Sequence, residues 1–174
     1  MATKDLKKVV SCKWIIVCGS STVDGDSNNI SLLNVFDEIQ IGIPENELKL
    51  PGQKAAPHPL EAVVLWEREE GSVGPIGFPF SVDYTDPSGK VLVSMSGEVK
   101  MEETHKRFRA RFKLNAVPFT DAGEYKFVVV SGDVGKTGTT ESCRSYLNIR
   151  INTAPSTEWS QGLVDSLNKT KGKK

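Results

Sequence analysis

The chain has 174 residues, of which 38% are hydrophobic, and its 22 Lys+Arg balance 22 Asp+Glu. That length suits one globular domain with a sizeable core, and the composition excludes disordered, collagen-like and membrane-spanning chains. The zero net charge hides a division. Residues 1–8 carry +2 and residues 169–174 carry +4, so the body between them is acidic at −6.

The N-terminal segment resembles an export signal only in part. Lys4, Lys7 and Lys8 provide a basic start, but Lys13 limits the apolar stretch to Trp14–Cys18, which is too short for a signal core. Three cysteines are an odd number, which favours a reducing cytoplasm over a disulfide framework. The sequence therefore predicts a cytoplasmic protein with buried, inert thiols and without a metal or cofactor.

Apolar and polar residues alternate along most of the chain. This alternation predicts strands over 78–84 and 91–101, separated by a turn at Asp86-Pro-Ser-Gly89. Residues 107–114 alternate most clearly, and the short link 102–105 predicts that this strand forms a hairpin with the one before it. Further strands are expected at Lys13–Gly19, Leu60–Glu69, Glu124–Ser131 and Ser142–Asn152.

The segment Ser31–Ile43 fits two periods. Its apolar residues match helical spacing, and they also match a strand that is interrupted at Asp37. We favour the strand, because the alternation continues to a stop at Gly42 and Pro44.

These elements predict one β-sandwich domain over residues 9–153, all-β and antiparallel. Residues 154–168 form a candidate amphipathic helix that opens at Pro155-Ser156. Its apolar face would carry Trp159, Leu163, Val164 and Leu167. The basic tail, 169–174, is predicted to be disordered.

One local motif adds a resemblance. Thr120-Asp-Ala-Gly-Glu-Tyr125 resembles the Asp-x-Gly-x-Tyr motif of immunoglobulin-type domains, which implies a structural tyrosine corner built from Asp121, Gly123 and Tyr125. The fold implied is an immunoglobulin-like β-sandwich of about 7–9 strands. Phe127 stands where antibody-type domains have a cysteine, so the disulfide of those domains is absent.

The layout of residues 12–151 also resembles an uncharacterised family of bacterial cytoplasmic proteins. The resemblance rests on Cys18-Gly-Ser-Ser21, Ser31-Leu-Leu-Asn-Val-Phe36, the Asp86–Gly89 turn and the tyrosine motif. It implies a β-sandwich and no known activity.

The most concentrated cationic feature is a row of basic residues on one face of a strand: Arg107, Arg109, Arg111 and Lys113. Such a row could follow phosphates or bind an acidic protein. The favoured interpretation is a solvated face with cross-strand partners such as Glu98 or Glu124, which also deters edge pairing. The acidic body and the lack of interleaved aromatic residues argue against nucleic acid.

Other local patterns depart from the motifs they resemble. The pattern that begins at Asp24 lacks the Gly at the sixth position and the Glu at the twelfth position of a calcium loop. Ser131–Gly138 lacks the first Gly of a phosphate loop. His58 and His105 are predicted to be turn residues that face solvent, with no catalytic triad around them.

The function predicted is a non-catalytic protein-interaction or structural module, bound to another protein or to a second copy. Arg107, Arg109, Arg111, Lys113, Trp159, Leu163 and Leu167 are its candidate contacts. The alternatives are a sandwich that binds carbohydrate or an anionic ligand, and a domain associated with a phage or virion. No membrane contact is expected.

Overall fold

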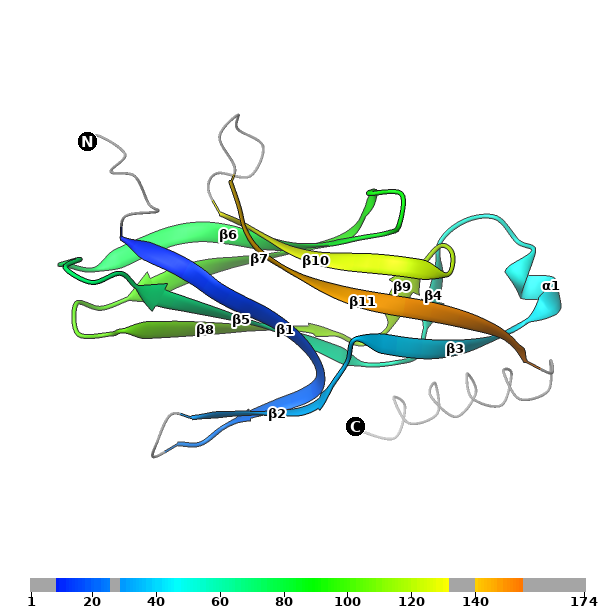
Figure 1. The fold of residues 1–174 in the computed structure, drawn as a ribbon, viewed down its shortest axis with the longest axis horizontal. Helices are drawn as coiled ribbons and strands as arrows, with labels where there is room; N and C mark the ends of the chain where they lie inside the picture. The colour runs from blue at the N-terminus through cyan, green and yellow to red at the C-terminus, as the bar shows by residue number, and fades with distance from the viewer. Residues whose placement is uncertain (1–8, 26–28, 132–139, 155–174) are drawn as a thin grey trace, which may run out of the picture.

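The structure is a computed structural model, and it describes residues 9–25, 29–131 and 140–154. Most of these residues lie in strands, which form two main sheets packed face to face (Figure 1). The prediction of an all-β, antiparallel sandwich is confirmed. The predicted helix over 154–168 and the basic tail lie outside the described residues, apart from Ala154 at the end of a strand.

The first sheet, sheet A, has the strand order β2-β1-β5-β8. Its members are β1 (Val10–Val23), β2 (Ile30–Val35), β5 (Leu60–Arg68) and β8 (Arg107–Leu114).

The second sheet, sheet B, has the order β3-β11-β10-β6-β7. Its members are β3 (Glu38–Pro44), β6 (Ile76–Thr85), β7 (Val91–Met101), β10 (Gly123–Ser131) and β11 (Thr140–Ala154). All its pairings are antiparallel except that of β3 with β11.

A small third sheet pairs β4 (Lys54–Ala56) with β9 (Val117–Phe119), and the four-residue helix α1 (Glu45–Leu48) precedes it. α1 and β4 lie between the predicted strands over 31–43 and 60–69, and β9 lies between those over 107–114 and 124–131. They are too short for a periodic pattern to reveal them.

The core lies between the two sheets and follows from the alternation of the strands. Trp66 of β5 is buried and meets Phe78 and Phe80 of β6 edge to face, with ring centroids 5.2 and 5.5 Å apart. Trp14 is only half-buried, so Trp66 is the core tryptophan. Phe127 fills the interior of β10 beside Tyr84, with centroids 4.6 Å apart.

The ambiguous segment 31–43 is a pair of strands, which confirms the extended interpretation. The break falls where the sequence suggests, because Asp37 lies between β2 and β3. Here the chain changes sheets. The Phe36 amide donates to the Val17 carbonyl in sheet A, and the Asn148 amide donates to the Asp37 carbonyl in sheet B.

The predicted hairpin between residues 91–101 and 107–114 is wrong. β7 pairs with β6 in sheet B, whereas β8 pairs with β5 in sheet A, so residues 102–106 cross between the sheets. Alternation fixes which face of a strand is buried, but both sheets bury the same kind of face. The pattern therefore does not choose the partner.

Candidate functional site

The basic row lies on β8, an edge strand of sheet A, and its charges have partners on neighbouring strands. The Arg107 guanidinium lies 3.0 Å from Glu67, and the Lys113 ammonium lies 3.1 Å from Glu61; both carboxylates belong to β5. Arg111 donates to the Ser21 carbonyl of β1 at 3.3 Å. This arrangement is a solvated strand face with cross-strand acidic partners, but those partners are not the predicted Glu98 and Glu124.

Glu98 and Glu124 do not pair with the basic row, because the strands that carry them lie in the other sheet. Glu98 lies on β7 in the other sheet, where its carboxylate pairs with Lys100 at 2.8 Å. Glu124 lies on β10, also in sheet B. Because β8 pairs with β5, its basic side chains meet the carboxylates of β5 instead.

The arginines also shield an apolar surface. Val63 and Leu65 of β5 point away from the core cluster, yet only 0% and 8% of their surfaces are exposed. They stand in register with Arg111 and Arg109 on β8. Long arginine stems can cover apolar neighbours while the charged head stays in water. The row is therefore part of the cover of sheet A.

Glu61 is a buried carboxylate that links the two sides of this sheet. It accepts hydrogen bonds from the Ser21 hydroxyl of β1 and from Lys113 of β8. Burial by itself raises the pKa of the Glu61 carboxyl, but the hydrogen bonds and positive charges of these neighbours outweigh it, so the pKa lies below its ordinary value. Glu61 thus stays ionised and holds β1, β5 and β8 together.

The tyrosine motif forms a closed local structure before β10. The Tyr125 hydroxyl accepts from the amides of Thr120 and Asp121 at 2.9 and 3.1 Å, and it donates to the Asp121 carbonyl at 2.7 Å. Gly123 has a φ of 144°, and a Cβ there would lie 3.0 Å from Pro87. This corner holds the backbone in place and leaves no group of Tyr125 for a ligand.

The Asp86–Gly89 turn is also present as predicted. The Gly89 amide donates to the Asp86 carbonyl at 2.9 Å, and the Asp86 carboxylate accepts from the Ser88 and Lys90 amides. The Ser88 hydroxyl donates to the same carboxylate at 2.6 Å. This bond, with those of the two amides and of Thr120, outweighs burial and keeps the pKa of Asp86 below its ordinary value.

At the same end of the sandwich lies an open pocket of about 470 Å³. Its lining combines α1, the segment after it and the two turns just described. Three of its residues are basic and two are acidic: Lys49, Lys54, Lys90, Asp86 and Asp121. Lys49 already pairs with Glu45 at 2.8 Å, and Lys54 donates to the Leu50 carbonyl at 2.7 Å.

The opposite edge of sheet A is apolar. β5 pairs with β1 only as far as Cys18. Beyond that point β2 is the one described strand that pairs with β1, although Ser21 still bonds to the side chains of Glu61 and Arg111. We call residues 20–23 with 30–35 the β1–β2 ribbon. It extends away from the sandwich in Figure 1. Its side chains include Val23, Leu33 and Val35, which are 43%, 51% and 60% exposed.

The outer edge of β2 has no strand paired to it among the described residues. Edge strands are usually protected by charged residues or proline, but the sequence Ile30-Ser-Leu-Leu-Asn-Val35 contains neither. Its one irregularity is Asn34, with a φ of 53°. The ribbon thus offers free backbone groups and apolar side chains together. The sequence analysis missed it, because the same leucines suited a buried strand or helix.

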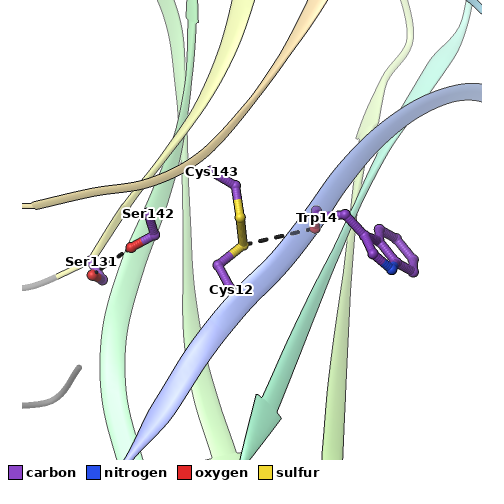
Figure 2. The surroundings of a disulfide bond; sticks show 5 residues. All are labelled: Cys12, Trp14, Ser131, Ser142 and Cys143. Carbon is purple, nitrogen blue, oxygen red and sulfur yellow. Dashed lines mark hydrogen bonds between the residues drawn. A yellow bond between two sulfur atoms is a disulfide. The ribbon is translucent and has the colours of Figure 1, made fainter. Parts of the chain in front are cut away.

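A disulfide joins the sheets near the start of β1 (Figure 2). Cys12 of β1 is bonded to Cys143 of β11, with Cα atoms 6.1 Å apart and a sequence separation of 131. The prediction of inert thiols is therefore wrong for these two residues. Spacing along the chain did not reveal the pair, because folding alone brings β1 and β11 together. Cys18 is a free, buried thiol, as predicted. Burial, and to a lesser extent the negative charge of Glu61, raises the pKa of this thiol.

The histidines do not form a site. His58 is half-buried against Phe36, with ring centroids 5.3 Å apart, so the prediction that it faces solvent is wrong. His105 is exposed in the crossing link, where its Nδ1 accepts from the Glu102 amide. Within the described parts of the chain, no three His, Cys, Asp or Glu residues are grouped to hold a metal ion.

Several predicted features lie outside the described residues. They are the middle of the Asp24–Asn29 turn, the loop after Ser131, and Trp159, Leu163 and Leu167. The hairpin that this loop closes is present, since β10 and β11 pair from Ser131 and Thr140 onward. No helix in the described ranges is long and apolar enough to cross a bilayer.

Comparisons with known proteins give little more. No family model matches the chain, and no curated protein matches it. A putative beta-galactosidase from Bacteroides fragilis is similar over 57% of this chain, with 13% identity and a TM-score of 0.33; the chain spans only 16% of that protein. The N-terminal domain of PorA is similar over 81% of this chain and 99% of its own, with 10% identity and a TM-score of 0.25.

Proposed function

We propose that the protein is a non-catalytic protein-interaction or structural module and that the β1–β2 ribbon is its contact surface. The observation that carries this proposal is the unprotected edge of β2, where exposed Leu33 and Val35 lie beside unpaired backbone groups. A partner strand added there would gain main-chain hydrogen bonds and apolar burial together. The basic row of β8 is less suited to this role, because its charges already have partners.

The experiment compares three full-length baits: the wild type, the double variant Leu33→Lys/Val35→Lys, and the control Val73→Lys. Val73 is 82% exposed on a loop far from the ribbon in sequence, so the control adds a lysine at another exposed apolar site. Each bait is exposed to extract of the source organism, and bound proteins are quantified by mass spectrometry. Direct titration with the purified partner then gives its affinity.

We expect a partner that the wild type and Val73→Lys retain equally and that the double variant loses by at least tenfold, which corresponds to about 1.4 kcal/mol. Equal retention by all three baits would place the contact elsewhere. Retention of no protein by the wild type would contradict the proposal of a protein partner.

A second candidate is the binding of an anionic ligand in the pocket beside α1, favoured by its three lysines. Its test is calorimetric titration of inorganic phosphate and of a sulfated disaccharide into the wild type and Lys90→Ala. Heat that the substitution abolishes would support this function; no heat with either ligand would reject it.

The cysteine count no longer supports a cytoplasmic location, since two of the three cysteines are joined. Disulfides persist mainly in oxidising compartments. Acid quenching of intact cells, followed by alkylation of the denatured chain and mass spectrometry, decides between the two environments. One alkylated cysteine per chain indicates an oxidising compartment, and three indicate the cytoplasm.

A further inference from the structure

We propose that residues 155–168 of this same chain dock on the β1–β2 ribbon through the apolar face that contains Trp159, Leu163 and Leu167. The proposal goes beyond the function suggested above, and it holds whether or not another protein also binds the ribbon. Three independent observations support it: the uncovered apolar surface, the place where β11 ends, and the charges at either end of the segment.

The ribbon needs a cover. A two-stranded hairpin is marginally stable in water unless it packs on something else. Over residues 20–23 and 30–33 no third strand of the described residues pairs with the ribbon, and Leu33 and Val35, two residues apart on β2, remain 51% and 60% exposed. A segment with four apolar residues on one face has the complementary requirement, because it must bury that face.

The chain leaves the sandwich at the right place for this contact. The last residue of β11, Ala154, pairs with Pro44 at the end of β3, and β3 runs parallel to β11. The start of β3, at Glu38, follows the ribbon by two residues. Six residue steps along β3 span about 20 Å, and a helix over 156–168 is also about 20 Å long. A helix that turns back at Pro155 and follows β3 therefore ends at the ribbon.

The charges of the tail and of the ribbon favour the same direction for the segment, from the end of β11 toward the ribbon. The far end of the segment is followed by four lysines in residues 169–174. The ribbon is flanked by acidic residues, with Asp24 and Asp26 at its turn and Asp37 after it. A helix that runs from β11 back to the ribbon would bring the basic tail to this acidic end, where the attraction favours docking.

The test uses hydrogen exchange in the full-length chain, measured by mass spectrometry on peptides that cover the ribbon. It compares the wild type with Leu163→Ser/Leu167→Ser and with the control Gln161→Ser. Gln161 lies on the opposite face of the predicted helix, so the control alters the same segment without altering its apolar face. Peptides from β5 report on the core, and peptides over 45–50 report on the other exposed leucines of this end.

We expect at least tenfold faster exchange over residues 20–35 in the double variant, with unchanged exchange in β5 and in Gln161→Ser. Equal exchange in all three proteins would overturn the proposal. Faster exchange over 45–50 in place of the ribbon would overturn it too, because the segment would then cover α1. The measurement is repeated over a hundredfold dilution; protection lost on dilution would show that a second copy supplies the cover.

A lost partner and a lost intramolecular contact are distinguishable. If the ribbon is a partner site but the segment does not cover it, the Leu33→Lys/Val35→Lys bait loses its partner while ribbon exchange is the same in all the segment variants. If the segment covers a ribbon that binds no other protein, the exchange result appears and the bait experiment is empty.

Discussion

The two edges of sheet A differ in every respect that matters for contact with other molecules. At β8 the edge is charged, and its basic side chains pair with Glu67 and Glu61 or lie over Val63 and Leu65. At β2 the edge is apolar, unpaired among the described residues, and without a charged residue. The edge that is conspicuous in the sequence is thus engaged within the domain, whereas the inconspicuous one is open.

This contrast shows how charge misleads when it is considered without a partner strand. On a single strand, a row of four basic residues has no visible partner within the domain. Such a row therefore suggests a ligand. Once β5 is placed beside it, two carboxylates and an apolar surface account for the row. Exposed Leu33 and Val35 on the edge of β2 have no comparable partner among the described strands.

The largest effect is expected from removing the disulfide. This bond joins β1, the strand that carries part of the ribbon, to sheet B. Because the sequence separation of Cys12 and Cys143 is 131, the loss of loop-closure constraint should cost up to about 5 kcal/mol of unfolding free energy. Urea unfolding of the oxidised wild type and of Cys12→Ser/Cys143→Ser measures this. A reductant should lower the midpoint of the wild type and leave that of the variant unchanged; an unchanged wild type would mean that the bond is absent in solution.

Glu61 connects the two edges, and Glu61→Gln tests that connection. Loss of the charge-assisted bonds to Ser21 and Lys113 should cost about 2 kcal/mol near neutral pH. The exposed Glu98→Gln, which also loses a lysine partner, should cost less than about 0.5 kcal/mol. Similar costs for the two variants would show that burial adds nothing to the contribution of Glu61.

The depressed pKa of Glu61 predicts how this difference depends on pH. Its stabilisation is fully present above the ordinary value of 4.5 and is lost as the pH falls through the lower pKa of the folded state. Gln does not titrate, so the gap between wild type and Glu61→Gln should shrink below pH 4.5. Unfolding midpoints taken at neutral pH and at about pH 3 measure the gap, and a constant gap would contradict the assignment.

Arg111 should matter through its stem more than through its charge. Arg111→Ala uncovers Val63 and removes the bond to the Ser21 carbonyl, for an expected loss of about 1 kcal/mol. Arg111→Lys keeps most of the stem and should recover at least half of that loss. Chemical denaturation measures both; a lysine variant as unstable as the alanine variant would make the guanidinium the important part.

The smallest effect on stability is expected from exchanging the characters of the two edges. Leu33→Lys and Lys113→Leu each alter an exposed position, and Leu33→Lys should change the unfolding free energy by less than about 0.5 kcal/mol. Their aggregation should diverge, because a lysine protects an edge and an added leucine exposes one. Light scattering at increasing concentration measures this, and identical onsets would remove the distinction between the edges.

Much of this architecture could be predicted from the sequence, because alternation records which face of each strand is buried. The strands around Phe80 and Tyr125 and the turn at Asp86 follow from local rules. Strand partners do not follow, and this one gap produced the wrong hairpin, the wrong acids for β8 and the missed Cys12–Cys143 bond. Each of these depends on contacts between residues far apart in the chain, which a single sequence does not specify.

The disulfide also determines how the domain would carry a mechanical load. Tension applied at the two ends of the chain enters β1 before Cys12 and leaves through β11 after Cys143, and the covalent bond transmits it directly between them. Everything from Lys13 to Ser142, including most of both sheets, lies inside the covalent loop and is not stretched. The strand ends outside the loop would be peeled away: Val10 and Ser11 from β5, and β11 from Arg144 onward, with its pairs to β10 and its seven parallel pairs to β3. An oxidised chain would therefore lengthen only at these ends, whereas a reduced chain would unravel completely.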